Sequence, residues 1–141
     1  MRTKLVAFLA CLLMGPAAGS AARPPPPDPL VGRWHGSSLC LVKPSPCHDE
    51  EVVYRIAAKP GGGYAIQAAK VVAGVEQDMG TLDATFAPAT GTLVAISAYQ
   101  SGGAARWLFQ LRDGRLSGRL VINGTTLFRR IEVRREPARP R

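Results

Sequence analysis

The chain has 141 residues and a formal net charge of +8, so its length suits one domain and leaves little room for two. The charge is uneven, because ten arginines lie between positions 106 and 141 against Asp113, Glu132 and Glu136, while residues 23–105 nearly balance. Such a basic half suits an anionic partner such as lipid head groups, glycans or an acidic protein. The interpretation that we favour from the sequence is instead an arginine-favouring genome that decorates solvent-exposed faces.

The N-terminus has the pattern of a secretory signal. Basic residues 1–4 precede an apolar run over residues 5–14, and small residues follow as far as Ala22. The run is shorter than the roughly 20 residues that a membrane-spanning helix needs. We therefore expect residues 1–22 to be a signal peptide and the protein to be periplasmic or secreted, without a stable membrane span and without a nucleic-acid partner. A permanent interfacial helix and lipidation at Cys11 are the less favoured alternatives.

Prolines mark both ends of the folded unit. Four consecutive prolines follow Arg23, and proline cannot donate a hydrogen bond to a sheet, so residues 23–29 are predicted to be an extended tether. Residues 136–141 are polar and broken by proline, which predicts a flexible tail. The folded domain is therefore expected over residues 30–135.

Two cysteines, Cys40 and Cys47, remain once the signal peptide is removed. In an exported chain, two cysteines this close together most simply form one disulfide bond. The bridge closes a short segment, so it is expected to pin a loop rather than to hold the whole fold.

Beyond the N-terminal run the sequence has no helical periodicity. Segments rich in β-branched and aromatic residues alternate with Gly, Asp, Asn or Pro turns, a pattern typical of a sandwich or barrel. Asp113-Gly114 and Asn123-Gly124 suit type I′ hairpin turns, so the last three strands are predicted to form an antiparallel meander. The eight predicted strands are residues 32–41, 51–59, 64–72, 75–86, 92–99, 106–112, 115–122 and 125–134.

Each predicted strand has an apolar face and a polar face. In one strand Tyr54 and Ile56 point to one side while Arg55 points to the other, as a sheet with one buried side requires. The alternation breaks around Met79-Gly80, which predicts a bulge. Eight strands that close on themselves leave no exposed edge. We therefore expect an all-β, eight-stranded, antiparallel up-and-down barrel, wide enough for side chains or one small ligand.

The motif Gly32-Arg33-Trp34 opens the first predicted strand. It resembles the opening motif of the lipocalin-like (calycin) superfamily, shared in form by lipocalins, fatty-acid-binding proteins and avidins. The resemblance implies that Trp34 closes one barrel end beneath an arginine of the last strand, for which alternation favours Arg129 over Arg130. Residues 40–50 also resemble a group of small exported bacterial lipocalin-like proteins without a known role. No lid, helix pair or biotin-contacting set matches, so the resemblance implies no particular ligand.

Few residues suggest catalytic chemistry. The densest polar cluster, His48-Asp49-Glu50-Glu51, has the residue types of a metal site, but it lacks spaced partners and reads more simply as a solvated loop. His35 is expected outside the barrel. No nucleophile–histidine–acid order and no paired acid–base carboxylates are evident. We therefore expect no enzymatic activity, no metal and no cofactor.

The function predicted from these features is binding, by a monomer. Small inward residues either let a barrel narrow or leave a cavity, and the leading hypothesis is a cavity for a small apolar molecule. The alternative is a protein-binding module for an envelope protein, such as a periplasmic protease or lysozyme inhibitor, with the proline tether and the Cys40–Cys47 loop as contacts. The candidate interior residues are Tyr54, Ile56, Ala68, Ala95, Trp107, Phe109 and Leu120.

Overall fold

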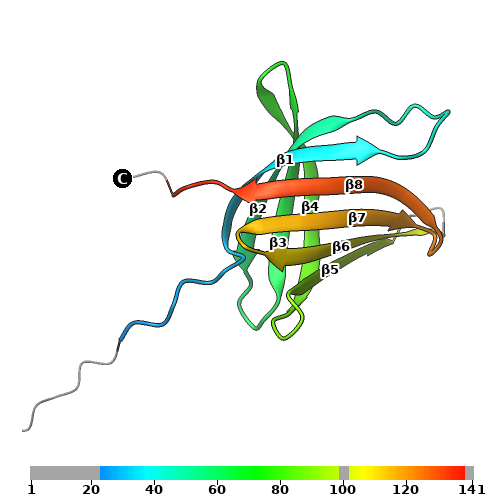
Figure 1. Ribbon diagram of the computed structural model, residues 1–141. Coiled ribbons are helices and arrows are strands. Elements are labelled where there is room, and N and C mark those ends of the chain that lie inside the picture. The colour runs from blue at the N-terminus through cyan, green and yellow to red at the C-terminus, as the bar shows by residue number, and fades with distance from the viewer. Residues whose placement is uncertain (1–22, 99–101, 139–141) are drawn as a thin grey trace, which may run out of the picture.

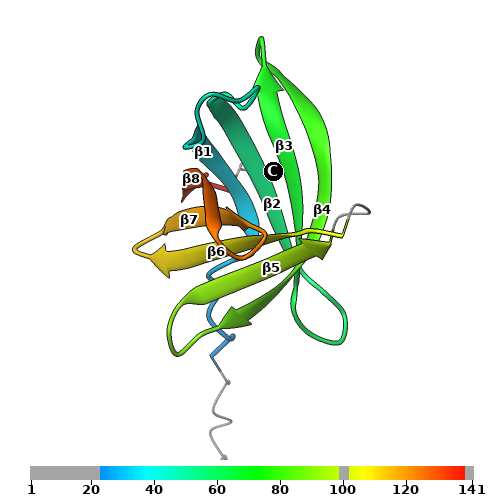
Figure 2. The same ribbon diagram turned by 90° about the vertical axis from the view of Figure 1, so that its right-hand side faces the viewer.

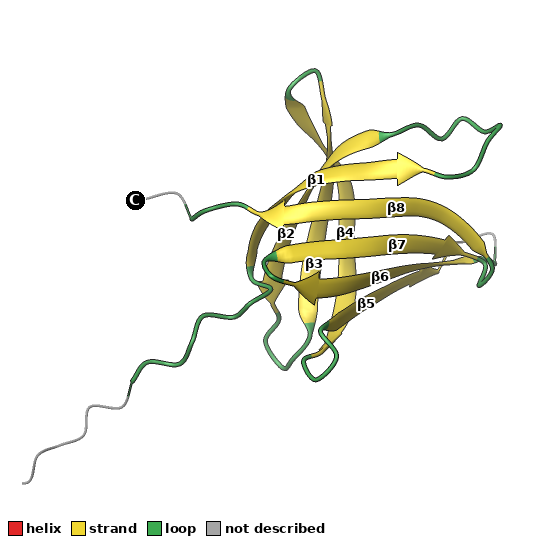
Figure 3. Cartoon of the chain, in the orientation of Figure 1, coloured by secondary structure: helices red, strands yellow, loops and turns green. Residues whose placement is uncertain are grey.

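The computed structural model describes residues 23–98 and 102–138, so the predicted signal peptide and the end of the predicted tail lie outside the described residues. Eight antiparallel strands close into one barrel in which each strand pairs with its neighbours in sequence and β1 pairs with β8 (Figure 1). The described part of the chain contains no helix, and hence no helix long and apolar enough to cross a membrane (Figure 3). The predicted all-β, up-and-down barrel is confirmed.

The strand boundaries lie close to those predicted from the sequence. The strand starts differ from the predicted ones by two residues at most: β6 begins at Ala104, two residues early, and β2 at Glu50 and β8 at Thr126 each differ by one residue. The strands are β1 (Gly32–Cys40), β2 (Glu50–Ala58), β3 (Tyr64–Val72), β4 (Val75–Ala87), β5 (Thr92–Ala98), β6 (Ala104–Arg112), β7 (Arg115–Ile122) and β8 (Thr126–Arg135).

The two predicted hairpin turns have the required backbone. Asp113 and Gly114 have φ values of 48° and 69°, and Asn123 and Gly124 have 50° and 76°. Positive φ at both central residues is the requirement of a type I′ turn, and it matches the right-handed twist of the flanking strands. The β6–β7 and β7–β8 hairpins follow from this local chemistry.

Closure of the barrel depends on a close approach of β1 to β8. Gly36 lies opposite Val133, and a Cβ added at Gly36 would lie 2.0 Å from the backbone oxygen of Glu132. Only glycine fits here. In Figure 2 the strands β5–β8 run steeply across β1–β4, so the closed sheet is strongly coiled.

Two bulges change which side chains point inward. Ala68 pairs with Gly80 and Ala69 with Asp78, so Met79 is left without a partner, and this is the bulge predicted around Met79-Gly80. The second bulge was not predicted: Leu120 pairs with Arg129 but Val121 pairs with Leu127. It reverses the alternation at the start of β8.

The core fills the barrel most densely at the end where both termini of the described chain emerge, on the left of Figure 1. The largest fully buried side chains include Trp34, Leu30, Leu93 and Leu116. The long β1–β2 loop and the β7–β8 turn lie on the opposite side of the view. We call these two ends the packed end and the open end.

Candidate functional site

The packed end is closed by Trp34, which is fully buried. Its indole Nε1 donates a hydrogen bond of 2.8 Å to the carbonyl oxygen of Leu30, so the only polar atom of the ring is satisfied. The guanidinium carbon of Arg135 lies 5.8 Å from the ring centroid. The same guanidinium donates to the carbonyl oxygens of Asp28 and Val31. Arg135 thus joins the last strand to the entering chain above the tryptophan.

The arginine over Trp34 is therefore Arg135 and not Arg129, and the prediction for Arg129 is wrong in position. Both arginines share the inward face of β8, so the alternation was correct. The β1–β8 register places Arg135 opposite Trp34 but Arg129 opposite Cys40, at the other end of β1. The two arginines are six residues apart, which is about 20 Å along the strand.

Asp28, in the predicted tether, anchors the entering chain to the barrel. Its carboxylate accepts hydrogen bonds from the amides of Leu30 and Val31 and from the hydroxyl of Tyr64 on β3. Partial burial opposes ionisation, but these hydrogen bonds together with Arg135 outweigh it and hold the pKa of Asp28 below its ordinary value. The bond to Asp28 in turn raises the pKa of Tyr64.

Two aromatic rings meet across the middle of the barrel. Tyr54 of β2 and Phe109 of β6 contact edge to face, with centroids 5.8 Å apart and planes at 72°. Beyond Tyr54, toward the open end, the interior is a cavity of about 400 Å³. Its walls are mainly apolar, with a polar group near the open end. The lining residues are Ser38, Glu50, Val52, Tyr54, Ala68, Met79, Gly80, Thr81, Leu82, Ser97, Trp107, Leu120, Arg129 and Ile131.

An ion pair supplies the main charge in this cavity. Arg129 Nη1 lies 3.3 Å from Glu50 Oε2, and the side chains are only 13% and 14% exposed. The same nitrogen donates to the hydroxyl and carbonyl oxygens of Ser38 and to the carbonyl oxygen of His48. A pair so shielded from water stays together, because either partner alone would be an uncompensated charge.

Tyr54 brings a neutral donor to the cavity. Its side chain is 4% exposed. Burial raises the pKa of its hydroxyl well above the ordinary value, and the carboxylate of Glu50 adds to this rise while Arg129 opposes it. Among the described residues no hydrogen-bond partner is found for this hydroxyl. No fully buried side-chain nitrogen or oxygen atom of the described residues lacks a partner. Tyr54 lines the cavity, so its hydroxyl is the neutral donor nearest to a molecule bound there.

The seven predicted interior residues divide between the cavity and the core. Tyr54, Ala68, Trp107 and Leu120 line the cavity. The other three point inward as predicted but are not among the cavity-lining residues, and they are between 1% and 4% exposed in the core. They are Ile56, Ala95 and Phe109.

The polar part of the cavity was missed at the sequence level. Glu50 was assigned to a solvated loop, although it continues the inward series of Val52, Tyr54 and Ile56 by one step of two residues. This continued spacing of two residues was the sequence signal that could have placed Glu50 on the inward face. Ser38, 2% exposed, gave no such signal because hydroxyls are common on either face of a strand.

The remaining residues of the His48 cluster point in different directions. Asp49 accepts a hydrogen bond from the Cys40 amide at 2.8 Å, and His48 Nδ1 lies 3.3 Å from the Pro46 carbonyl oxygen. Within residues 23–98 and 102–138, no group of three His, Cys, Asp or Glu side chains is placed to hold a metal ion. The predicted disulfide is confirmed, with a Cα–Cα distance of 5.9 Å between Cys40 and Cys47.

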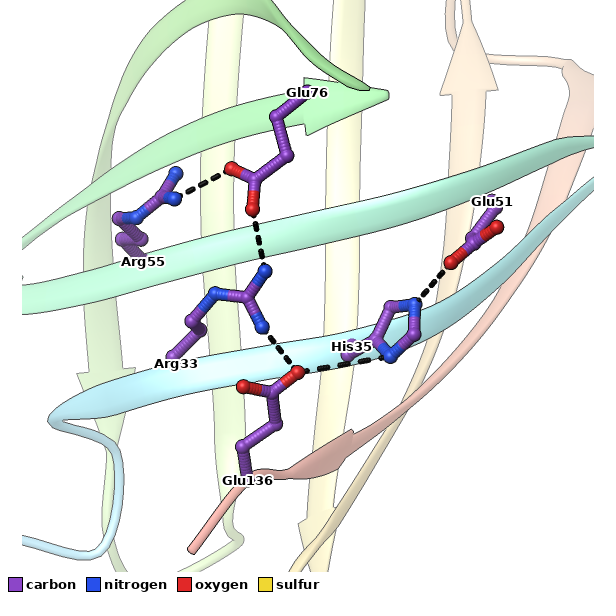
Figure 4. A network of polar contacts seen from close by, with 6 residues as sticks. All are labelled: Arg33, His35, Glu51, Arg55, Glu76 and Glu136. Atoms are coloured by element: carbon purple, nitrogen blue, oxygen red, sulfur yellow. Dashed lines mark hydrogen bonds and ion pairs between the residues drawn. The ribbon is translucent and has the colours of Figure 1, made fainter. Parts of the chain in front are cut away.

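A second polar network lies outside the barrel (Figure 4). His35 Nε2 is 2.6 Å from Glu51 Oε1, and Arg33 pairs with both Glu76 and Glu136. Hydrogen bonds from Arg33 and Arg55 lower the pKa of Glu76. The residues of this network come from β1, β2, β4 and the segment after β8, and they tie these elements together. They are Arg33, His35, Glu51, Arg55, Glu76 and Glu136.

The fold and the cavity define an eight-stranded antiparallel β-barrel that is packed at one end and hollow at the other. Comparison with protein-family models, with curated proteins and with solved structures finds no match to this chain.

Proposed function

We propose that this chain is an exported, lipocalin-like, non-enzymatic barrel that binds one small amphipathic molecule at its open end. The observation that carries the proposal is the cavity of about 400 Å³ between Tyr54 and the Glu50–Arg129 pair. Ligand sites are typically a few hundred Å³ in volume and combine apolar walls with a few fixed polar groups. The cavity has both features.

The lipocalin-like assignment is supported by the packed end. Gly32 and Trp34 open β1, and an arginine of the last strand, Arg135, covers the indole. Export is supported by the apolar run over residues 5–14 and by the Cys40–Cys47 disulfide, since disulfides persist in oxidising compartments.

The charges in the cavity indicate the polar group of the ligand. Glu50 already neutralises Arg129, so a ligand carboxylate would have to displace Glu50 from its partner. An uncharged hydroxyl or amide can instead accept from Tyr54 and donate to Glu50 without breaking the pair. We therefore infer an apolar molecule with a neutral polar end, such as a long-chain or polyene alcohol.

The test is a fluorescence titration with retinol and retinoic acid as matched probes. Trp107 lines the cavity while Trp34 lies at the packed end, so Trp107→Phe should reduce, without abolishing, the energy transfer from tryptophan to the bound probe. We expect retinol to bind more tightly than retinoic acid. Glu50→Gln should reduce or invert that preference, because Arg129 then becomes available to a carboxylate.

A pair of variants tests the place of binding. Ala68→Phe puts a ring into the cavity and should abolish probe binding, whereas Ala57→Phe on the outer face of the same sheet should leave it unchanged. Circular dichroism confirms that each variant is folded. Equal binding by both variants, or no binding of either probe by the unmodified chain, contradicts the proposal. Capture of an envelope protein that is lost on deletion of loop residues 41–47 would instead favour the protein-binding alternative.

A further inference from the structure

The outer face of β6–β8 carries a concentration of arginines without acidic partners. Six arginines point outward from these strands, and all are exposed. None of them lies within 4.0 Å of a carboxylate oxygen of the described residues. The six are Arg106, Arg112, Arg115, Arg119, Arg130 and Arg134.

The outer face of β1 and β2 is different. Arg33 and Arg55 both pair with Glu76, and Lys59 pairs with Asp83 at 2.7 Å. On β6–β8 the outward carboxylate is Glu132, which accepts a hydrogen bond from the Ser117 hydroxyl at 2.7 Å. Among the described residues, the cations of β1 and β2 are thus paired with carboxylates, whereas the outward arginines of β6–β8 are not.

The register sets like charges against one another. Arg119 lies directly opposite Arg130, and Arg115 lies opposite Arg134. Like charges at opposed cross-strand positions destabilise a sheet. The fold gains nothing from these pairs, and an external anion that bridges the guanidinium groups would relieve their repulsion.

Aliphatic side chains lie among the arginines nearest the open end. Leu108 is opposite Arg119, and Leu39 of β1 is opposite Arg130. Leu127, turned outward by the β8 bulge, is 44% exposed, and Leu39 is 40% exposed. Shallow grooves of about 460 and 430 Å³ run along Leu108, Arg119 and Leu127. The arginines near the packed end lack such neighbours.

We propose that this mixed surface docks on an anionic phospholipid bilayer. We call it the docking face and define it by Arg106, Arg119 and Arg130 together with Leu39, Leu108 and Leu127. Guanidinium groups bind lipid phosphates in a forked geometry, and aliphatic side chains between them enter the boundary of the acyl region. A soluble polyanion would satisfy the arginines but leave the leucines in water, so the combination favours a membrane surface.

The docking face adjoins the cavity wall. Arg106 is followed by Trp107, and Arg119 by Leu120, and both of these next residues line the cavity. Docking would therefore bring the open end close to the lipid. The proposal does not depend on whether the cavity holds a ligand.

The experiment measures vesicle binding by co-sedimentation, with the protein expressed from its complete sequence and purified as the cell processes it. Vesicles of phosphatidylglycerol and phosphatidylcholine are compared with vesicles of phosphatidylcholine alone. We expect binding only to the anionic vesicles, and it should weaken as the salt concentration rises. Absence of binding to anionic vesicles overturns the proposal, as does binding to heparin without binding to vesicles.

Two triple variants of equal charge identify the face. The triple change Arg106→Gln, Arg119→Gln and Arg130→Gln should weaken binding to anionic vesicles about a hundredfold. The loss of each arginine is expected to weaken binding by about tenfold or less. The control triple, Arg112→Gln, Arg115→Gln and Arg134→Gln, should weaken it less than about tenfold, because these residues lie nearer the packed end. Equal losses in the two triples would show attraction by net charge alone and overturn the assignment of the face.

The apolar part has its own test. Leu127→Gln keeps every charge and changes an exposed side chain, so the fold should be retained. We expect vesicle binding to fall roughly fivefold to tenfold, with its salt dependence unchanged, because partial burial of a leucine is lost. Unchanged binding by this variant would contradict insertion of the aliphatic side chains.

Discussion

Trp34 of β1 and Arg135 of β8 lie directly opposite each other, and the guanidinium of Arg135 stands 5.8 Å from the centroid of the buried indole. The pair closes the barrel at its packed end. Because Arg135 also donates to the carbonyl oxygens of Asp28 and Val31, one side chain holds the first strand, the last strand and the entering chain together.

Replacing Arg135 should measurably destabilise the barrel. Arg135→Met removes the cation–π contact and the two hydrogen bonds, so we expect the free energy of unfolding to fall by about 1–2 kcal/mol. Arg134→Met is the matched control, since Arg134 points outward without a described carboxylate partner, and its effect should stay within about 0.5 kcal/mol. Guanidinium denaturation followed by tryptophan fluorescence measures both. Equal effects would show that the contact over Trp34 contributes nothing specific.

The Glu50–Arg129 pair should behave as a coupled unit. Arg129→Met leaves a carboxylate that is only 14% exposed without its partner. We expect a loss of stability of about 2 kcal/mol, lower than for a fully buried pair. Adding Glu50→Gln to the same chain should recover part of that loss, because the orphaned charge is gone. A double-mutant cycle measured by denaturation gives the coupling, and strictly additive effects would contradict it.

Substitution by alanine should destabilise the protein more at Gly36 than at Gly118. A Cβ at Gly36 would meet the backbone of β8, so Gly36→Ala should cost more than about 3 kcal/mol or prevent folding. A Cβ at Gly118 would lie 2.4 Å from the ring of Phe109, which is a side chain and can be replaced.

The second glycine therefore offers a rescue. Gly118→Ala should cost about 1–3 kcal/mol, and Gly118→Ala with Phe109→Leu should be more stable than Gly118→Ala alone. No comparable side-chain change should rescue Gly36→Ala. Thermal unfolding followed by circular dichroism distinguishes these cases, and equal destabilisation by the two alanines would refute the difference.

Stability should depend on acid pH through Asp28. The pKa of Asp28 in the folded chain lies below its ordinary value of 3.8, so the folded state favours the ionised form. Its contribution is therefore present above about pH 4 and is lost as the pH falls through the lower, folded pKa. Asp28→Asn should remove this part of the acid dependence, while Asp113→Asn in the exposed β6–β7 turn should preserve it. Denaturation curves between pH 2 and pH 6 give the comparison.

The fold was predictable because its signals are local. Alternation set the faces of the strands, and Asp113-Gly114 and Asn123-Gly124 set two of the turns. These signals depend only on neighbours in sequence. Because they agree along the whole chain, they favour a single architecture. The bulge around Met79-Gly80 was also visible as a break in alternation.

The candidate site was predictable only in part, because it depends on contacts between distant strands. Alternation placed Arg129 on the inward face, but its height in the barrel follows from the β1–β8 register, which joins the two ends of the domain. The bulge in β8 leaves Phe128 without a cross-strand partner. It was not predicted, because the sequence shows no break in the alternation of apolar and polar residues at that point. Glu50 was hidden because charged residues beside a turn usually face water.

The contact between Tyr54 and Phe109 separates two tasks within one small barrel. On one side of these rings, side chains from all around the sheet hold the fold, and a change there alters stability. On the other side the Glu50–Arg129 pair also contributes to stability, but some of the wall residues are only partly buried. Ser97 and Trp107, which line the cavity and are only partly buried, are therefore positions at which the cavity could be redesigned for a new ligand at low cost in stability.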